Sequence, residues 1–180
     1  MAGRLEGKVA IVTGGESWIG EGTIRRYVEE GAKCNIADIQ TELAKSLADD
    51  LGDEAVPFSL DVADEDQVKA CVDFAVKEFG SLDVMFNNAG ILGSVGPIGD
   101  IERDGWLRTI DVLLSSVFYG IKHAARVMQD QGYGSIINTA STAGVRAGLG
   151  PHVYTAAKHA VVGLSQSVAT ELGPHGIRVN

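Results

Sequence analysis

The stretch TGGESWIG, residues 13–20, follows the apolar run VAIV at residues 9–12 and precedes a segment with helical periodicity. A glycine-rich turn between a buried strand and a helix bends tightly and presents a helix N-terminus, which binds phosphate groups well. Gly14 and Gly20 lie at the two ends of this turn, and Trp18 stands between them. The stretch therefore predicts an alternating strand–helix chain with a phosphate site after its first strand.

The rest of the chain continues this alternation. Short β-branched runs predict strands at residues 9–13, 33–38, 56–62, 82–87, 135–140 and 177–180, and helical periodicity predicts helices at 19–30, 41–51, 65–79, 103–129 and 154–172. Asp64 and Gln67 predict a capping box at the third helix, and Gly31, Gly52, Gly80 and Gly173 lie where helices should stop. Such a pattern is typical of an α/β fold with a doubly wound parallel sheet, the Rossmann fold, which binds ligands beyond the carboxyl ends of its strands. We interpret residues 1–180 as a single dinucleotide-binding domain.

Composition and charge exclude several classes of protein. The chain has 180 residues and a formal net charge of −9, and its Lys and Arg residues form no cluster, so we expect no nucleic-acid partner. Cys34 and Cys71 lack metal-ligand or disulfide spacing, and the four histidines are scattered, so we expect reduced thiols and no metal. No stretch is long enough to span a membrane or typical of a signal peptide. A cytoplasmic protein with no membrane partner is therefore the expectation.

Asp38 indicates which dinucleotide would bind. It ends the second predicted strand, 18 residues after Gly20, where a carboxylate can accept hydrogen bonds from the adenosine ribose hydroxyls. The same charge repels the 2′-phosphate of NADP, and neighbouring Gly15, Glu16 and Ile39 supply no basic side chain to offset that repulsion. The pattern favours NAD as cofactor, with a merely solvated strand-end aspartate as the alternative.

Tyr154 and Lys158 lie one turn apart on one face of the last predicted helix. A lysine ammonium stabilises a nearby phenolate and lowers the tyrosine pKa from its usual value of about 10. Ser141, 13 positions before Tyr154 at the end of the fifth predicted strand, could polarise a substrate carbonyl. A Ser-His-Asp hydrolase using Ser141, His152 and Asp111 is an alternative, but no G-x-S-x-G elbow surrounds the serine.

These motifs, in this order, resemble the short-chain dehydrogenase/reductase family over the whole chain. The resemblance is closest to NAD-dependent secondary-alcohol dehydrogenases such as the secoisolariciresinol dehydrogenase group. The motifs that carry it are TGGESWIG, Asp38, Asp61-Val62, NNAG at 87–90, Ser141, YTAAK at 154–158 and IRVN at 177–180. The resemblance implies an oxidoreductase that transfers a hydride between NAD(H) and a small-molecule secondary alcohol or ketone. It also implies a homodimer or homotetramer in a full-length form.

The resemblance assigns roles to individual positions. The implied catalytic residues are Ser141, Tyr154, as general acid/base, and Lys158. The implied cofactor-binding residues are Gly14, Ser17, Trp18, Ile19, Gly20, Asp38, Ile39, Asp61, Val62, Asn88, Ala89, Gly90, Tyr154 and Lys158.

The chain departs from the family pattern in three places. Trp18 replaces a glycine of the loop, and we expect it to weaken NADH binding by roughly one to two orders of magnitude through backbone strain of about 1–3 kcal/mol. Leu113 replaces an asparagine that normally helps to hold a water in the proton relay. The chain ends at Asn180, so we expect a domain that is truncated after the sixth strand. The alternative function is therefore a catalytically impaired NAD-binding protein or an inactive fragment of this family.

Overall fold

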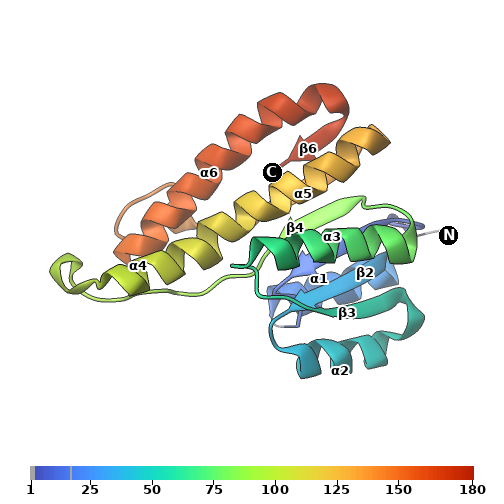
Figure 1. Ribbon diagram of the computed structural model, residues 1–180, viewed down its shortest axis with the longest axis horizontal. Coiled ribbons are helices and arrows are strands. Elements are labelled where there is room, and N and C mark those ends of the chain that lie inside the picture. The colour runs from blue at the N-terminus through green and yellow to red at the C-terminus, as the bar shows by residue number, and fades with distance from the viewer. Residues whose placement is uncertain (1–2, 17) are drawn as a thin grey trace.

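The computed structural model describes residues 3–16 and 18–180, and Ser17 lies outside the described residues. Its sheet has six parallel strands in the order β3-β2-β1-β4-β5-β6 (Figure 1). The strands are β1 (Val9–Thr13), β2 (Lys33–Asp38), β3 (Ala55–Ser59), β4 (Val84–Asn87), β5 (Gly134–Asn138) and β6 (Ile177–Val179). The strand order reverses direction between β1 and β4. This arrangement confirms the predicted doubly wound Rossmann fold.

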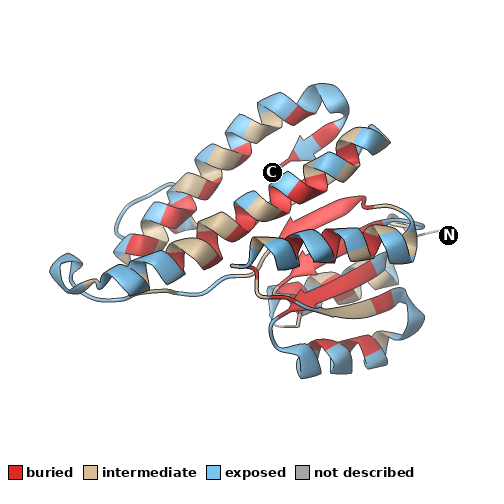
Figure 2. Cartoon of the chain, viewed as in Figure 1, coloured by how far each residue is buried: buried red, intermediate tan, exposed pale blue. Residues whose placement is uncertain are grey.

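Helices cover both faces of the sheet. They are α1 (Ile19–Glu29), α2 (Thr41–Leu51), α3 (Glu65–Phe79), α4 (Arg103–Ile110), α5 (Ser116–Gln131) and α6 (His152–Leu172). Alternate side chains of a strand point to opposite faces, so Ala10 and Val12 of β1 pack with α1 and α2, whereas Ile11 packs with α3, α5 and α6. Figure 2 shows the result: the strands are mostly buried and the helices expose their outer surfaces.

Several element boundaries differ from the predicted ones. The predicted helix at 103–129 is interrupted by a π-helical segment, Asp111–Ser115, between α4 and α5. The predicted strands at 56–62 and 135–140 end earlier, at Ser59 and Asn138, because the chain leaves the ladder to form the loops of the cavity described below. Gly173 does lie directly after the last residue of α6, as predicted, and the chain continues there as a 3-10 turn.

The start of α3 positions one of these loops. The Asp64 carboxylate accepts a hydrogen bond from the backbone N–H of Gln67 at 3.1 Å, which confirms the predicted cap and lowers the pKa of Asp64. The Gln67 amide oxygen accepts from the backbone N–H of Asp61 at 3.0 Å rather than from the cap residue itself. The cap therefore also fixes the loop after β3, which carries Asp61 and Val62.

Candidate cofactor-binding and active site

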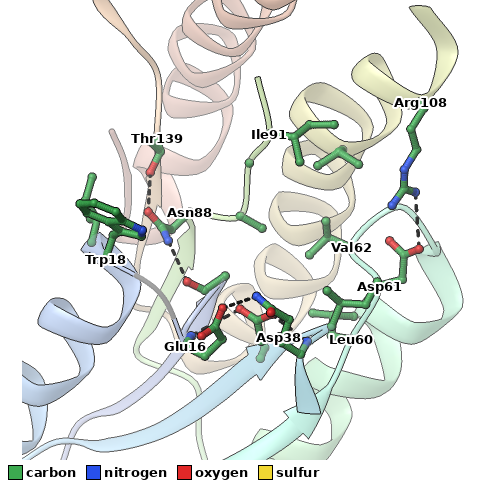
Figure 3. A pocket seen from close by; sticks show the side chains of 18 residues that line it. Glu16, Trp18, Asp38, Leu60, Asp61, Val62, Asn88, Ile91, Arg108 and Thr139 are labelled. Atoms are coloured by element: carbon green, nitrogen blue, oxygen red, sulfur yellow. Dashed lines mark hydrogen bonds and ion pairs between the residues drawn. The ribbon is translucent and has the colours of Figure 1, made fainter. Parts of the chain in front are cut away.

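A cavity of about 370 Å³ opens at the carboxyl ends of β1 to β4, where the strand order reverses (Figure 3). The sequence-predicted residues that line it are Gly14, Trp18, Ile19, Asp38, Ile39, Asp61, Val62, Asn88, Ala89 and Gly90. Lining residues that the sequence reasoning missed are Glu16, Ala37, Gln40, Leu60, Ile91, Arg108, Val112 and Thr139. Ala37 lies within β2, and each of the others follows a strand or faces the cavity from α4 or the π segment. The sequence alone does not show that these side chains face one cavity.

Gly14 and Gly20 make the loop after β1 compact. Gly14 has φ 62°, and a Cβ added there would lie 2.9 Å from the Cα of Ala89. A Cβ at Gly20 would lie 2.0 Å from the carbonyl oxygen of Gly14. Both positions require glycine because any side chain would separate α1 or the β4 loop from the turn. Gly20 thus shapes the loop without lining the cavity.

Asn88 ties the end of β4 to the end of β1. Its side-chain amide donates to the carbonyl oxygens of Thr13 at 3.1 Å and Gly14 at 3.2 Å. In return, the Thr13 hydroxyl accepts from the backbone N–H groups of Asn88 at 3.0 Å and Ala89 at 3.1 Å. These bonds cross the point where the strand order reverses, so they fix the glycine loop against the central strands.

Trp18 stands at the cavity mouth with its side chain 93% exposed. Its backbone has φ 46° and ψ −106°, a conformation that favours glycine, and its carbonyl accepts from the N–H of Gly22 at 3.1 Å. The indole therefore extends into solvent and leaves the cavity open. The backbone strain that we expected to weaken NADH binding is present, but the indole does not block the cavity.

Asp38 is 6% exposed and is held by the backbone on both sides. Its Oδ1 accepts from the N–H of Gln40 at 3.0 Å, and its Oδ2 accepts from the N–H of Glu16 at 3.4 Å. Each carboxylate oxygen keeps a further lone pair that can accept a hydroxyl proton. The basic residue among the described lining residues, Arg108, instead lies 3.5 Å from Asp61, on the far side of the cavity.

Lys158 lies outside the cavity but is linked to it. Its side chain is 3% exposed, and its ammonium donates to the carbonyl of Thr139 at 2.6 Å. Burial lowers the pKa of Lys158. The Thr139 hydroxyl donates to the Asn88 side chain at 3.4 Å, and the Lys158 ammonium is 5.7 Å from the centre of the Tyr154 ring. The predicted catalytic residues Tyr154 and Lys158 therefore do not line the cavity but lie behind Thr139, which does.

Ser141 lies at the end of the β5 loop and caps the short 3-10 turn Thr142–Gly144. Its hydroxyl oxygen accepts from the N–H of Ala143 at 3.1 Å. A Cβ at Gly144 would lie 2.7 Å from the Lys158 carbonyl, so this turn packs directly on α6 beside the lysine. Among the described residues, no hydrogen bond joins Ser141 to a histidine, and His152 is exposed. This geometry gives no support to the hydrolase alternative.

Leu113, the second departure from the family pattern, is fully buried in the π segment. Its Cδ2 would lie 3.4 Å from a Cβ at Gly90, so the side chain packs beside the β4 loop. Leucine cannot form hydrogen bonds, so this position contributes an apolar contact where the expected relay would need a polar group.

The positions and burial of residues in the described part of the chain bear on metal ligands, membrane-spanning helices and reactive thiols. Residues 3–16 and 18–180 contain no cluster of three His, Cys, Asp or Glu side chains arranged to hold a metal ion. None of the helices described there is both long and apolar enough to cross a membrane. Burial raises the pKa of the Cys34 and Cys71 thiols to about 12, which makes both weak nucleophiles.

Comparison with known proteins identifies the family. Residues 8–180 match the family model described as short chain dehydrogenase. Zerumbone synthase of Zingiber zerumbet is 51% identical over 98% of this chain and 67% of its own length, and (+)-borneol dehydrogenase 2 of Salvia officinalis is 49% identical over 98% and 64%. The crystal structure of NAD⁺-bound xylitol dehydrogenase superposes with a TM-score of 0.93 at 34% identity, covering 98% of this chain and 69% of that one.

The chain therefore belongs to the short-chain dehydrogenase family, as its motifs indicated. It spans about two thirds of the length of these relatives.

Proposed function

We propose that the protein is an oxidoreductase that binds NAD(H) in the cavity and transfers a hydride between it and a secondary alcohol or ketone. One observation carries this proposal. Buried Asp38 and the glycine loop lie at one end of the cavity, and Thr139, at the other end, is hydrogen-bonded to Lys158. The xylitol dehydrogenase that this chain resembles was crystallised with NAD⁺.

The residues present suit a dinucleotide. Gly14 and Gly20 let the loop approach a pyrophosphate closely, and the Asp38 carboxylate has lone pairs for the ribose hydroxyls. Asp61 and Val62 would border the adenine, whereas Asn88, Ala89 and Gly90 would line the middle of the cofactor. The cofactor, when bound, accepts or supplies the hydride.

The proton chemistry belongs to Tyr154. Tyr154, whose ring centre lies 5.7 Å from the Lys158 ammonium, would take the hydroxyl proton of an alcohol and return it to a ketone. Ser141 would position the substrate oxygen, and Lys158 would also hold the nicotinamide ribose. Oxidation and reduction thus use the same three side chains.

Titration of both reduced cofactors tests the cofactor assignment. We expect NADH to bind more tightly than NADPH, and Asp38→Ala to narrow the difference by weakening NADH. Asp53→Ala removes an exposed aspartate outside the cavity and serves as the matched control. Tighter binding of NADPH by the parent chain would refute the assignment.

A second candidate function is an NAD-binding protein with impaired turnover, which buried Leu113 favours because it cannot serve in a proton relay. One assay distinguishes the two candidate functions. It measures NADH formation from NAD⁺ in the presence of secondary alcohols. Borneol is the first alcohol to test, because one relative is named as a borneol dehydrogenase. Turnover supports the first function, whereas NADH binding without turnover supports the second.

A further inference from the structure

Glu16 stands beside Asp38 in the loop after β1 and also lines the cavity. Its backbone N–H donates to Asp38 Oδ2 at 3.4 Å, as the N–H of Gln40 does to Oδ1 at 3.0 Å. The side chains of Gln40 and Glu16 also contact each other, because the Gln40 amide donates a hydrogen bond to Glu16 Oε1. Figure 3 shows Glu16 and Asp38 side by side in the cavity. Two carboxylates, rather than one, therefore face the region assigned to the adenosine ribose.

We propose that Glu16 is a second specificity-determining residue, which acts with Asp38 to exclude a 2′-phosphate, while Gln40 holds the Glu16 carboxylate in position. The inference rests on the proposed function, because it assumes that the cavity binds the adenosine half of NAD(H).

The charges around Glu16 support this role. Burial, followed by the negative charge of Asp38, raises the pKa of Glu16, so the two carboxylates lie close enough to repel each other. A phosphate monoester carries a charge of about −1.5 to −2 at neutral pH and would add to this repulsion. A free 2′-hydroxyl instead offers a proton that either carboxylate can accept.

The arginines described in the cavity lining and on α1 pair with carboxylates other than Glu16. Arg108 lies 3.5 Å from Asp61 across the cavity. Arg25, on α1, pairs with Glu21 at 2.9 Å and with Asp50 at 2.6 Å. Within the part of the chain that the structure describes, the Glu16 carboxylate accepts a hydrogen bond from the neutral amide of Gln40, which orients the carboxylate without reducing its charge.

The test compares ADP-ribose with 2′-phospho-ADP-ribose by calorimetric titration of the parent chain and Glu16→Gln. The substitution keeps the shape of the side chain and removes its charge. We expect the affinity for the 2′-phosphorylated ligand to rise about five- to tenfold relative to that for ADP-ribose, as expected for one unit charge a few ångströms away in water-like surroundings. The absolute affinity for 2′-phospho-ADP-ribose should also rise, and such a gain cannot result from a damaged fold.

Glu42→Gln is the matched control, because Glu42 is exposed in the first turn of α2 and does not line the cavity. It makes the same change in net charge and should leave the affinity ratio within about twofold. An unchanged ratio in Glu16→Gln, or an equal rise in Glu42→Gln, would overturn the inference while leaving NAD binding intact. Failure of the parent to bind ADP-ribose would overturn the proposed function, and this inference with it.

Discussion

The Lys158 ammonium on α6 and the Thr139 carbonyl after β5 are joined by a hydrogen bond of 2.6 Å. Thr139 lines the cavity, whereas Lys158 does not, so this bond connects the helix that carries Tyr154 to the wall of the proposed cofactor site. One buried cation thus contacts the cavity wall and lies near the candidate catalytic phenol. Its substitution should affect turnover and cofactor binding together, and Lys158→Ala should weaken both.

The burial of Lys158 predicts a pH-dependent contribution to stability. Burial lowers its pKa in the folded chain below the ordinary value of 10.5, so between these two values the unfolded chain binds more protons. The free energy of unfolding attributable to this lysine therefore rises with pH through that window. We expect the Tm of the parent minus that of Lys158→Met to increase as the pH is raised towards 10.5. A difference that stays constant or shrinks would contradict the lowered pKa of Lys158.

Tyr154→Phe removes the hydroxyl proposed to transfer the proton and keeps the ring. We expect turnover to fall by about 10²–10⁴-fold, the usual contribution of general acid–base catalysis, with NADH binding retained. Tyr133→Phe makes the same change at an exposed tyrosine just before β5, at the opposite end of that strand from Ser141, and is the control. Turnover by Tyr154→Phe within a few-fold of the parent would remove Tyr154 from the mechanism.

Leu113→Asn would place the amide of the family pattern in a fully buried apolar site. Loss of apolar burial and an amide without assured partners should together lower the free energy of unfolding by about 3–5 kcal/mol. Leu113→Met, which conserves volume, should cost less than about 1.5 kcal/mol. Thermal unfolding measures both, and turnover of the folded Leu113→Asn protein shows whether the amide restores a relay. Equal Tm values for the two variants would contradict the packing assigned to Leu113.

The sequence predicted those parts of the site that depend on strand ends. Gly14, Asp38 and Asn88 each follow a run of apolar residues, and parallel strands bring their carboxyl ends to one edge, so their convergence on one cavity could be inferred. Arg108 and Thr139 could not be predicted in this way. Their places depend on how α4 packs and on where β5 stops.

Glu16 and Gln40 illustrate a second reason why part of the site could not be predicted from the sequence. Each belongs to a polar loop, where a sequence pattern cannot indicate which way a side chain turns. Their side-chain hydrogen bond depends on the backbone bonds that both residues make to Asp38. The π segment at Asp111–Ser115 was missed for a similar reason, because one extra residue in a helical turn leaves the apolar periodicity almost unchanged.

Two substitutions of Trp18 separate the effect of its indole on stability from the effect of its strained backbone. The indole is 93% exposed, and φ of 46° is a conformation that costs a non-glycine residue about 1–3 kcal/mol. Trp18→Gly relieves that strain but adds freedom to the unfolded chain, which costs about 0.5–1 kcal/mol. The net gain of up to about 2 kcal/mol should raise Tm by a few degrees. Trp18→Ala removes the indole and keeps the strain, so it should give no such rise.

The same two variants decide whether Trp18 weakens cofactor binding. If the loop has the same backbone with and without cofactor, its strain is present in both states and cancels from the binding free energy. In place of the weakening of about one to two orders of magnitude that the sequence indicated, we therefore expect NADH affinities within about threefold of the parent for both variants, measured by calorimetric titration. The reason is that the indole projects into solvent and the loop strain cancels. Tightening of tenfold or more in Trp18→Gly alone would show that the loop becomes strained only when the cofactor binds. Equal tightening in Trp18→Ala would show that the indole turns inward and competes for the phosphate position.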